Sequence, residues 1–376
     1  MARRVFLHIG LPKTATTYLQ TIVWSNRDVA AAQGLTLPGR ERRDHLWASR
    51  VVRETPKRPR PDREHEAWRR ILDDVAAATG DVLISHEFFA AASGAQARAV
   101  LEALAPAEVH VVITAREPLG LFTASWQESL KNRGTTPMAE YGRTESSRPE
   151  DIWDWRTLDL RLVLRRWRKA VAADRIHVLP LDPRAARDEI WHRFAGLLGL
   201  DAAAFDTSAG FSNQSMGVVE AELLRRVNHH LHGFSSALDR GVWIRSFLAD
   251  DRLVPRGGER FWPLPDQIED CRRRGEATLR FLREHPVDVV GDPELLRVPT
   301  VIEPRRTPDS VTDAEIAAAG AEVIAVLLED VRAARRGSAA VEADDVEGGE
   351  DDGGPRAPAS VLGRVRLGRR RNGGAG

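Results

Sequence analysis

The segment from residue 5 to residue 20 constrains the fold of this chain more than any other stretch. A short apolar run from Val5 to Ile9 breaks at Gly10-Leu11-Pro12-Lys13, and the spacing of a helix start follows from Thr14. Gly10 lets the backbone turn without a Cβ clash, and Pro12 fixes its own φ, so the loop is stiff. The segment therefore predicts a strand, a tight loop and a helix.

The end of this loop is suited to binding an anion. Unpaired amides at a helix N-terminus and the positive end of the helix dipole attract negative charge, and Lys13 adds a full positive charge. The hydroxyls of Thr14, Thr16 and Thr17 add possible donors. The expected ligand is a phosphate-like oxyanion, and the simpler alternative is a helix N-terminus beside an unrelated lysine.

The loop departs from the Walker A pattern Gly-x-x-x-x-Gly-Lys-Ser/Thr, because Pro12 stands where that pattern has the glycine before its lysine. The run Pro12-Lys13-Thr14-Ala15-Thr16-Thr17 instead resembles the 5′-phosphosulfate-binding loop of sulfotransferases of the bacterial type, commonly Pro-Lys-x-x-Thr-Thr. The resemblance implies that Gly10 and residues 12–17 bind the 5′ end of 3′-phosphoadenosine 5′-phosphosulfate (PAPS). It also implies that Lys13 stabilises the departing phosphate, with no metal required.

Several further segments alternate between strand and helix patterns. Apolar runs at 81–85, 108–114 and 175–181 predict strands, and 64–79, 93–104, 158–171 and 188–198 predict helices. This alternation predicts a parallel sheet with right-handed crossovers. Together with the loop, it indicates an α/β fold, a P-loop NTPase-like three-layer sandwich with a central parallel sheet flanked by helices.

A second motif follows the strand expected at 108–114. In sulfotransferases an arginine that ends such a strand, with a serine about nine positions later, binds the 3′-phosphate of PAPS, and Arg116 and Ser125 match this spacing. Arginine suits the task because its planar guanidinium can pair with two phosphate oxygens. A strand-end arginine taken alone is more often a surface ion pair. Arg116 also stands where a P-loop NTPase would have an acid for Mg²⁺.

The end of the strand expected at 81–85 supplies candidates for a general base. Transfer of a sulfuryl group to an alcohol needs a base near the acceptor, and sulfotransferases take a His or Glu from this place in the chain. Both occur here, as His86 and Glu87. Glu87 is the first choice, and His86 is its alternative, or orients it. If the extended backbone persists, the two side chains point to opposite sides, and only one faces the acceptor.

Composition excludes some classes of partner. Lys+Arg and Asp+Glu both number 55, so no net charge steers the chain toward nucleic acid. The single cysteine, Cys271, fits a reducing cytoplasm, and no stretch reaches the ~20 apolar residues of a membrane span. We therefore expect a cytoplasmic protein without a membrane span, whose oligomeric state the sequence leaves open. The histidines 229, 230 and 232 do not have the spacing of a metal site.

The expected domain organisation is one sulfotransferase domain, 1–336, with a core at 4–217 and a helical part at 218–336, followed by a disordered charged tail at 337–376. Within the core, 34–63 is expected to be an irregular surface excursion, and 134–155 a lid that binds the acceptor. A segment at 211–217 resembles an Asn-x-Ser element of bacterial sulfotransferases that closes over the nucleotide; an ordinary helix cap is the alternative.

Three functions remain in view. The first is transfer of a sulfuryl group from PAPS to a hydroxyl or amine of a carbohydrate, lipid or small metabolite. The second is a P-loop kinase-like nucleotide phosphotransferase, which would share the fold. The third is a noncatalytic nucleotide-binding protein, which would keep the anion loop but lack a working base. Arg116 and Ser125 argue against the second function, and His86 and Glu87 argue against the third.

Overall fold

The computed structural model describes residues 2–208 and 215–347. The chain divides into two compact units, Met1–Val323 and Ile324–Gly376. The first contains the sheet and the candidate site, and the described part of the second continues helix α13 (Asp313–Glu347). This helix extends past residue 336, the boundary expected for the tail. Among the described residues, none of the helices contains an apolar stretch of the length that a membrane span requires.

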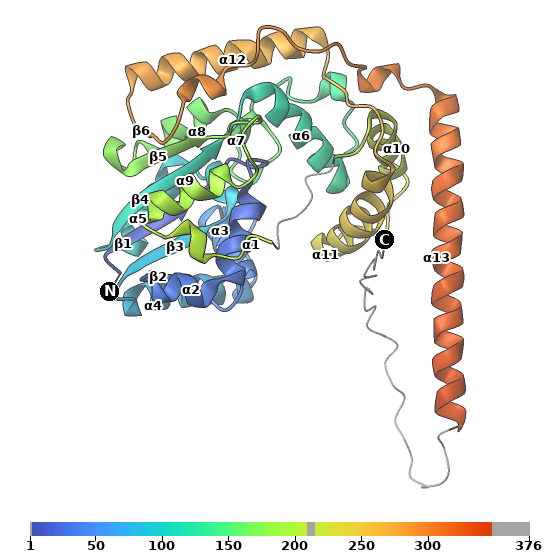
Figure 1. Ribbon diagram of the computed structural model, residues 1–376, viewed down its shortest axis with the longest axis horizontal. Helices are drawn as coiled ribbons and strands as arrows, with labels where there is room; N and C mark the ends of the chain where they lie inside the picture. Colours follow the sequence, from blue (N-terminus) through green and yellow to red (C-terminus); the bar gives the residue numbers. More distant parts are fainter. Residues whose placement is uncertain (1, 209–214, 348–376) are drawn as a thin grey trace. The chain divides into compact units, whose positions relative to one another are not determined.

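The first unit is built on one parallel sheet of six strands, in the order β2-β3-β1-β4-β5-β6 (Figure 1). Every neighbouring pair runs parallel. The strands are β1 Arg4–His8, β2 Leu35–Thr36, β3 Asp81–Ser85, β4 Glu108–Ala115, β5 Ile176–Pro180 and β6 Asp288–Val289. Helices flank the sheet, so the predicted α/β sandwich with a central parallel sheet is confirmed.

Helices connect the strands and also follow the last one. The longer ones are α1 Thr16–Ser25, α2 Arg27–Ala32, α3 Arg42–Val52, α4 Asp62–Ala77, α5 Gly94–Leu104, α6 Pro118–Lys131, α8 Leu160–Trp167, α9 Glu189–Leu198, α10 Val218–Asn228 and α12 Pro265–Glu284. Short helices used below are η1 Glu87–Ala91 and α7 Trp155–Leu158, and η5 Arg240–Leu253 is a π-helical segment.

The strand order brings three strand ends together. His8 at the end of β1 is in register with Ser85 of β3 on one side and with Val112 of β4 on the other. The chain leaves β1 toward β2 on one side of the sheet and leaves β4 toward β5 on the other, so the direction of the connections reverses between β1 and β4. A crevice at the carboxyl ends of the strands is expected at such a switch point. The loop after β1 lies there.

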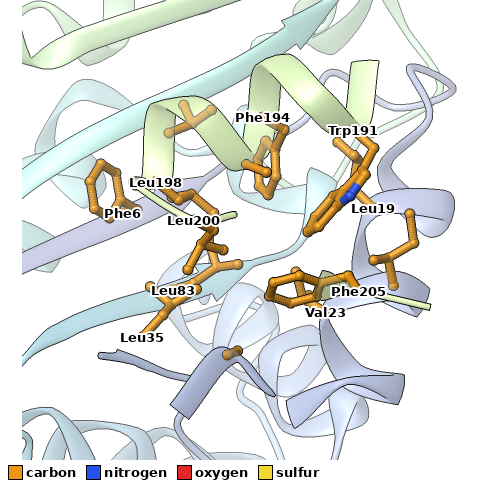
Figure 2. Packing of buried hydrophobic residues seen from close by; sticks show 14 of the residues in the cluster. Phe6, Leu19, Val23, Leu35, Leu83, Trp191, Phe194, Leu198, Leu200 and Phe205 are labelled. Atoms are coloured by element: carbon orange, nitrogen blue, oxygen red, sulfur yellow. The ribbon is translucent and has the colours of Figure 1, made fainter. Parts of the chain in front are cut away.

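Packing on one face of the sheet holds the helix that follows this loop. Phe6 and Leu83 point from β1 and β3 into a buried cluster with Leu19 of α1 and with Trp191 and Phe194 of α9 (Figure 2). The alternate strand residues, Val5, Leu7, Val82 and Ile84, point to the other face and are also fully buried. Burial on both faces explains why these strands read as continuous apolar runs.

The structure corrects two expectations about helices. Residues 34–63 are not irregular, because they contain β2 and α3. The buried face of α3 carries the polar or small residues Asp44, His45, Ala48 and Ser49, so it lacks the apolar periodicity that marks a helix in sequence. The helix expected at 158–171 is the shorter α8, and a separate short helix, α7, precedes it. Asp159 lies between the two helices, and its side chain accepts a hydrogen bond from the Leu162 amide.

Candidate active site

The loop after β1 has an unusual backbone. Lys13 and Ala15 both have φ of 63°, a left-handed conformation that residues with a Cβ rarely adopt. Ala15 is the N-cap of α1, and no side chain caps that terminus. The first amides of α1 therefore have neither an intrahelical partner nor a capping side chain. Strained backbone of this kind is concentrated at functional sites, which agrees with the anion loop expected from the sequence.

Gly10 lets the loop approach the end of β3. Its φ is 101°, and a Cβ at this position would lie 2.9 Å from the Cβ of Glu87. Real Cβ atoms do not come this close, so a side chain at Gly10 would push the loop away from Glu87. Gly10 thus brings together the two segments that the sequence singled out separately.

The three threonines of the loop have different environments. Thr14 is fully buried, with its Oγ1 2.5 Å from the Leu11 carbonyl oxygen and 2.7 Å from the Thr114 Oγ1. Its hydroxyl therefore fixes the loop to the end of β4 and does not face the cavity. Thr16 and Thr17 both line the cavity, and Thr17 is exposed there.

One cavity of about 1510 Å³ collects most of the predicted site residues. Its lining includes Lys13, Ala15, Thr16, Thr17, His86, Glu87 and Arg116. Gly10, Pro12, Thr14 and Ser125 are not part of the lining. The structure therefore brings together the loop, the candidate bases and the strand-end arginine.

Lys13 has a carboxylate partner that sequence reasoning missed. Its Nζ lies 2.9 Å from Oε2 of Glu128 on α6, and Arg245 of η5 pairs with the other oxygen of the same carboxylate. Burial alone would raise the pKa of Glu128, but the attraction of Lys13 and Arg245 and the hydrogen bond from Lys13 lower the pKa to about 2. Glu128 is therefore charged at neutral pH and holds the Lys13 ammonium on the cavity wall. Nothing in the local sequence pairs residues so far apart.

His86 and Glu87 both line the cavity, and the extended backbone on which the expectation of opposite directions depended does not persist. The extended backbone ends at His86, and the 3₁₀ helix η1 begins at Glu87, so the alternation of a strand does not continue. His86 Nδ1 accepts a hydrogen bond from the Phe88 amide at 3.2 Å and lies 3.8 Å from Glu87 Oε2.

Burial shifts the pKa values of the two side chains in opposite directions. Burial, and then the positive charges of Arg53 and Arg50, lower the pKa of His86 well below its usual range. Burial raises the pKa of Glu87. His86 is therefore a neutral imidazole, and because its Nδ1 accepts a hydrogen bond, its proton lies on Nε2.

Arg116 and Ser125 are not brought to the same place. The Arg116 side chain is 36% exposed, lines the cavity, and its Nε lies 3.5 Å from Glu117 Oε1. Ser125 is fully buried, and its hydroxyl lies 2.7 Å from the Tyr141 hydroxyl. Successive residues of a helix are rotated by about 100°, so Ser125 lies on another side of α6 from its neighbour Ala124, and that side is buried. Thr123 and Ala124 line the cavity instead.

A buried row of polar side chains joins the three central strand ends beneath the loop. His8 Nδ1 lies 2.8 Å from Ser85 Oγ, and its Nε2 lies 3.2 Å from Thr114 Oγ1. His45 of α3 accepts a hydrogen bond from the Ser85 amide at 3.1 Å. Burial lowers the pKa of His8 to about 3 and that of His45 to about 4, so both are neutral.

Sequence reasoning also missed a group of arginines on the cavity wall beside η1. We call these the arginine cluster: Arg42, Arg43, Arg50, Arg53, Arg58 and Arg60. More cations line the cavity from the C-terminal half, at Arg240, Arg245, Arg260 and Arg305, whereas its acidic residues are Glu87, Glu128 and Glu150. The available signal in the sequence was the arginine-rich composition of 34–63, which does not show where these arginines lie relative to the site.

The structure also places parts of the Asn-x-Ser element and the histidines near residue 230. Of the Asn-x-Ser element, residues 211–214 lie outside the described residues, and Ser215 and Met216 line the cavity. His229 and His232 line it as well. In the described part of the chain, no three His, Cys, Asp or Glu side chains are grouped as a metal site.

Comparison with known proteins gives one partial likeness. Neither a protein-family model nor a curated protein matches the sequence. Among solved structures, the chain is similar to a sulfotransferase from Alicyclobacillus acidocaldarius, with 17% identity and a TM-score of 0.40. The match covers 57% of this chain and 88% of that one.

Proposed function

We propose that this chain is a sulfotransferase, which transfers a sulfuryl group from PAPS to a hydroxyl or amine of an acceptor. The observation that carries the proposal is the shared cavity: the Lys13 loop, Arg116 and the Glu87–His86 pair all line it. An anion site, a second cation and a candidate base are the groups that this reaction needs from a protein.

The residues present fit a donor with two anionic ends. The uncapped amides of α1, with Lys13, Thr16 and Thr17, would bind the 5′-phosphosulfate. Arg116 would bind the 3′-phosphate. Ser125 has no part in this proposal as a direct ligand, because its hydroxyl is enclosed with Tyr141. PAPS supplies the sulfuryl group and a phosphate that departs with the bridging oxygen.

In the proposed reaction, a bond forms between the acceptor oxygen and sulfur as the bond between sulfur and the bridging oxygen breaks. Glu87 accepts the proton of the acceptor hydroxyl, and Lys13 stabilises the negative charge that grows on the bridging oxygen. The raised pKa of Glu87 favours this role, since it makes the carboxylate a better proton acceptor. The ring nitrogen of His86 that remains free, Nε2, already carries a proton and cannot accept another. We therefore assign His86 to positioning rather than to the role of base.

The two alternative functions make different demands. A kinase-like phosphotransferase would need an acid at the end of the strand beside β1 for Mg²⁺, and β4 ends at Ala115, followed by Arg116. A noncatalytic binding protein would need no base in the cavity, whereas Glu87 lies there.

The proposal is tested by incubating the purified chain with PAPS labelled in its sulfuryl group and a panel of saccharides, lipids and phenols. We expect label in an acceptor and release of 3′,5′-bisphosphoadenosine. Transfer of the γ-phosphate of ATP under the same conditions would support the kinase instead. Tight bisphosphate binding without transfer to any acceptor would support the noncatalytic alternative.

A further inference from the structure

The arginine cluster is an accumulation of positive charge with few carboxylates at ion-pair distance. Among the described residues, Arg50 is the one member with a carboxylate at ion-pair distance, 3.0 Å from Glu64 Oε1. Arg42, Arg43, Arg53, Arg58 and Arg60 line the cavity without such a partner. Like charges gathered on one wall repel one another, so the arrangement is unfavourable until an anion binds.

Arg53 shows this most clearly. It is 4% exposed, and its Nε and Nη1 donate to the carbonyl oxygens of Ser49 and Pro149, each at 2.9 Å. Burial and the nearby charges of Arg60 and Arg50 lower the pKa of Arg53 to about 9, although the negative charge of Glu150 acts in the opposite direction. The Arg60 Nε is also buried and has no hydrogen-bond partner among the described residues. A buried guanidinium with no carboxylate at ion-pair distance is costly, which points to an anionic ligand.

The cluster lies on the acceptor side of the site. Arg116 follows β4, on one side of β1, and would bind the donor. The guanidinium of Arg53 instead lies 5.4 Å from the ring of Phe88 in η1, after β3 on the other side. Arg53, Arg50 and Arg42 act on His86 through their charge. Members of the cluster therefore lie beside the candidate bases, on the side of β1 away from Arg116.

We propose that the acceptor is an anionic saccharide, with its acid groups bound by the arginine cluster and one of its hydroxyls presented to Glu87. This proposal rests on the sulfotransferase function. Acidic sugars carry many hydroxyls together with regularly spaced negative charges. Phe88 and Trp153, with ring centroids 6.0 Å apart, add aromatic surface to the same wall. The volume exceeds the roughly 300–1,000 Å³ of a pocket for one small ligand, which leaves room for an oligosaccharide beside the donor.

The test compares two probes that differ only in charge. One is a hexasaccharide of alternating uronic acid and N-acetylhexosamine, and the other is the same hexasaccharide with its carboxylates reduced to alcohols. Their affinities for the full chain are measured by calorimetry at low salt. We expect the acidic form to bind at least about tenfold more tightly, equivalent to about 1.4 kcal/mol. The difference should shrink as salt is added.

Variants locate the binding. Arg60→Gln and the exposed Arg43→Gln should each weaken binding of the acidic hexasaccharide severalfold and leave bisphosphate binding unchanged. The control is Arg69→Gln, an exposed arginine on α4 outside the cavity, which should change neither. Because Arg43 is exposed, its substitution does not threaten the fold.

The outcomes separate this inference from the proposed function. Equal affinity for both hexasaccharides, no binding of either, or equally tight binding of single-stranded RNA would overturn the anionic saccharide, even with bisphosphate binding intact. A preference for the acidic form that survives Arg60→Gln and Arg43→Gln would overturn the role of the cluster. If the wild-type chain does not bind 3′,5′-bisphosphoadenosine, that result alone would count against the sulfotransferase function. A preference for the acidic hexasaccharide that depends on the arginine cluster would still support the acidic ligand.

Discussion

At the scale of single residues, Lys13 takes part both in an ion pair and in the proposed reaction. Its ammonium pairs with Glu128, at 2.9 Å, and in the proposed reaction it stabilises the departing phosphate. The carboxylate of Glu128 also pairs with Arg245 and remains charged at neutral pH. Glu128 therefore keeps Lys13 extended along the cavity wall, at the cost of competing with the ligand for its charge.

The first prediction concerns this lysine. Lys13→Ala should lower kcat by about 10²–10³-fold, the usual cost of removing one group that stabilises transition-state charge. Its effect on the affinity for 3′,5′-bisphosphoadenosine should be smaller. Steady-state kinetics and calorimetry measure the two effects, with the exposed Lys57→Ala as the control. An unchanged kcat with only a raised KM would mean that Lys13 binds the ground state alone.

The second prediction separates Glu87 from His86. Glu87→Gln keeps the shape of the side chain and loses its basicity, so the rate should fall by about 10²–10⁴-fold while bisphosphate still binds. His86→Ala should lose less, since a positioning residue is missing rather than the base. If His86→Ala proves the more damaging variant, the base is His86.

The pH profile gives an independent readout for the same pair. The pKa of Glu87 is raised by burial, so the wild-type rate should rise with pH, and the midpoint of this rise should lie above the ordinary glutamate pKa of about 4.3. His86 is neutral and should add no limb near its ordinary value of about 6.5. A residual rate in Glu87→Gln that keeps the wild-type limb would contradict the assignment.

At the scale of elements, the carboxyl ends of β3, β1 and β4 are joined by buried polar contacts. His8 bridges Ser85 and Thr114, and Thr114 in turn contacts Thr14 of the loop. The loop is thus fixed to the sheet through neutral hydrogen-bonding groups. Burial opposes a charge on these histidines, because a charged imidazole inside the protein loses its hydration.

The third prediction follows from these histidines. Their folded pKa values, about 3 for His8 and about 4 for His45, lie below the unfolded value of about 6.5. Below that pH the unfolded chain binds protons that the folded chain does not, so stability should fall as pH drops from 6.5 toward 4. The slope approaches about 1.4 kcal/mol per pH unit for each histidine.

Urea unfolding at a series of pH values between about 7 and about 5 measures this slope, above the range where most carboxylates titrate. His45→Gln should give a less stable chain with a flatter dependence on pH. A wild-type free energy of unfolding that stays constant across this range would contradict the neutral, buried state of both histidines.

Sequence reasoning reached the elements whose pattern is local. The strand, loop and helix at 5–20 follow from apolar spacing, Gly10 and Pro12, and Ser93 marks the start of α5, where it forms a capping box with Gln96. It missed α3, because the buried face of that helix is polar and packs around His45. It misjudged Ser125, because a count of residues does not say which side of α6 faces the cavity. Glu128 and the arginine cluster reach the site only through tertiary folding.

At the scale of the first unit, charge is distributed unevenly. The whole chain has a formal net charge of +0, yet the cations along the cavity greatly outnumber Glu87, Glu128 and Glu150. A cavity lined by one sign of charge concentrates ligands of the opposite sign and speeds their association. Binding to this cavity should therefore weaken as salt is raised. A neutral total charge thus hides the strong local positive charge of this cavity.

The central claim is that this cavity binds a nucleotide with phosphates at both its 3′ and 5′ positions. Calorimetry of the full chain with 3′,5′-bisphosphoadenosine, AMP and ATP, each with and without Mg²⁺, tests it most directly. We expect the bisphosphate to bind much more tightly than AMP or ATP and independently of Mg²⁺. Arg116→Ala should remove most of this preference, since a charge-assisted hydrogen bond contributes about 1.5–3 kcal/mol, and Arg69→Gln should keep it. Equal affinities for the three nucleotides, or ATP binding that depends on Mg²⁺, would contradict the account.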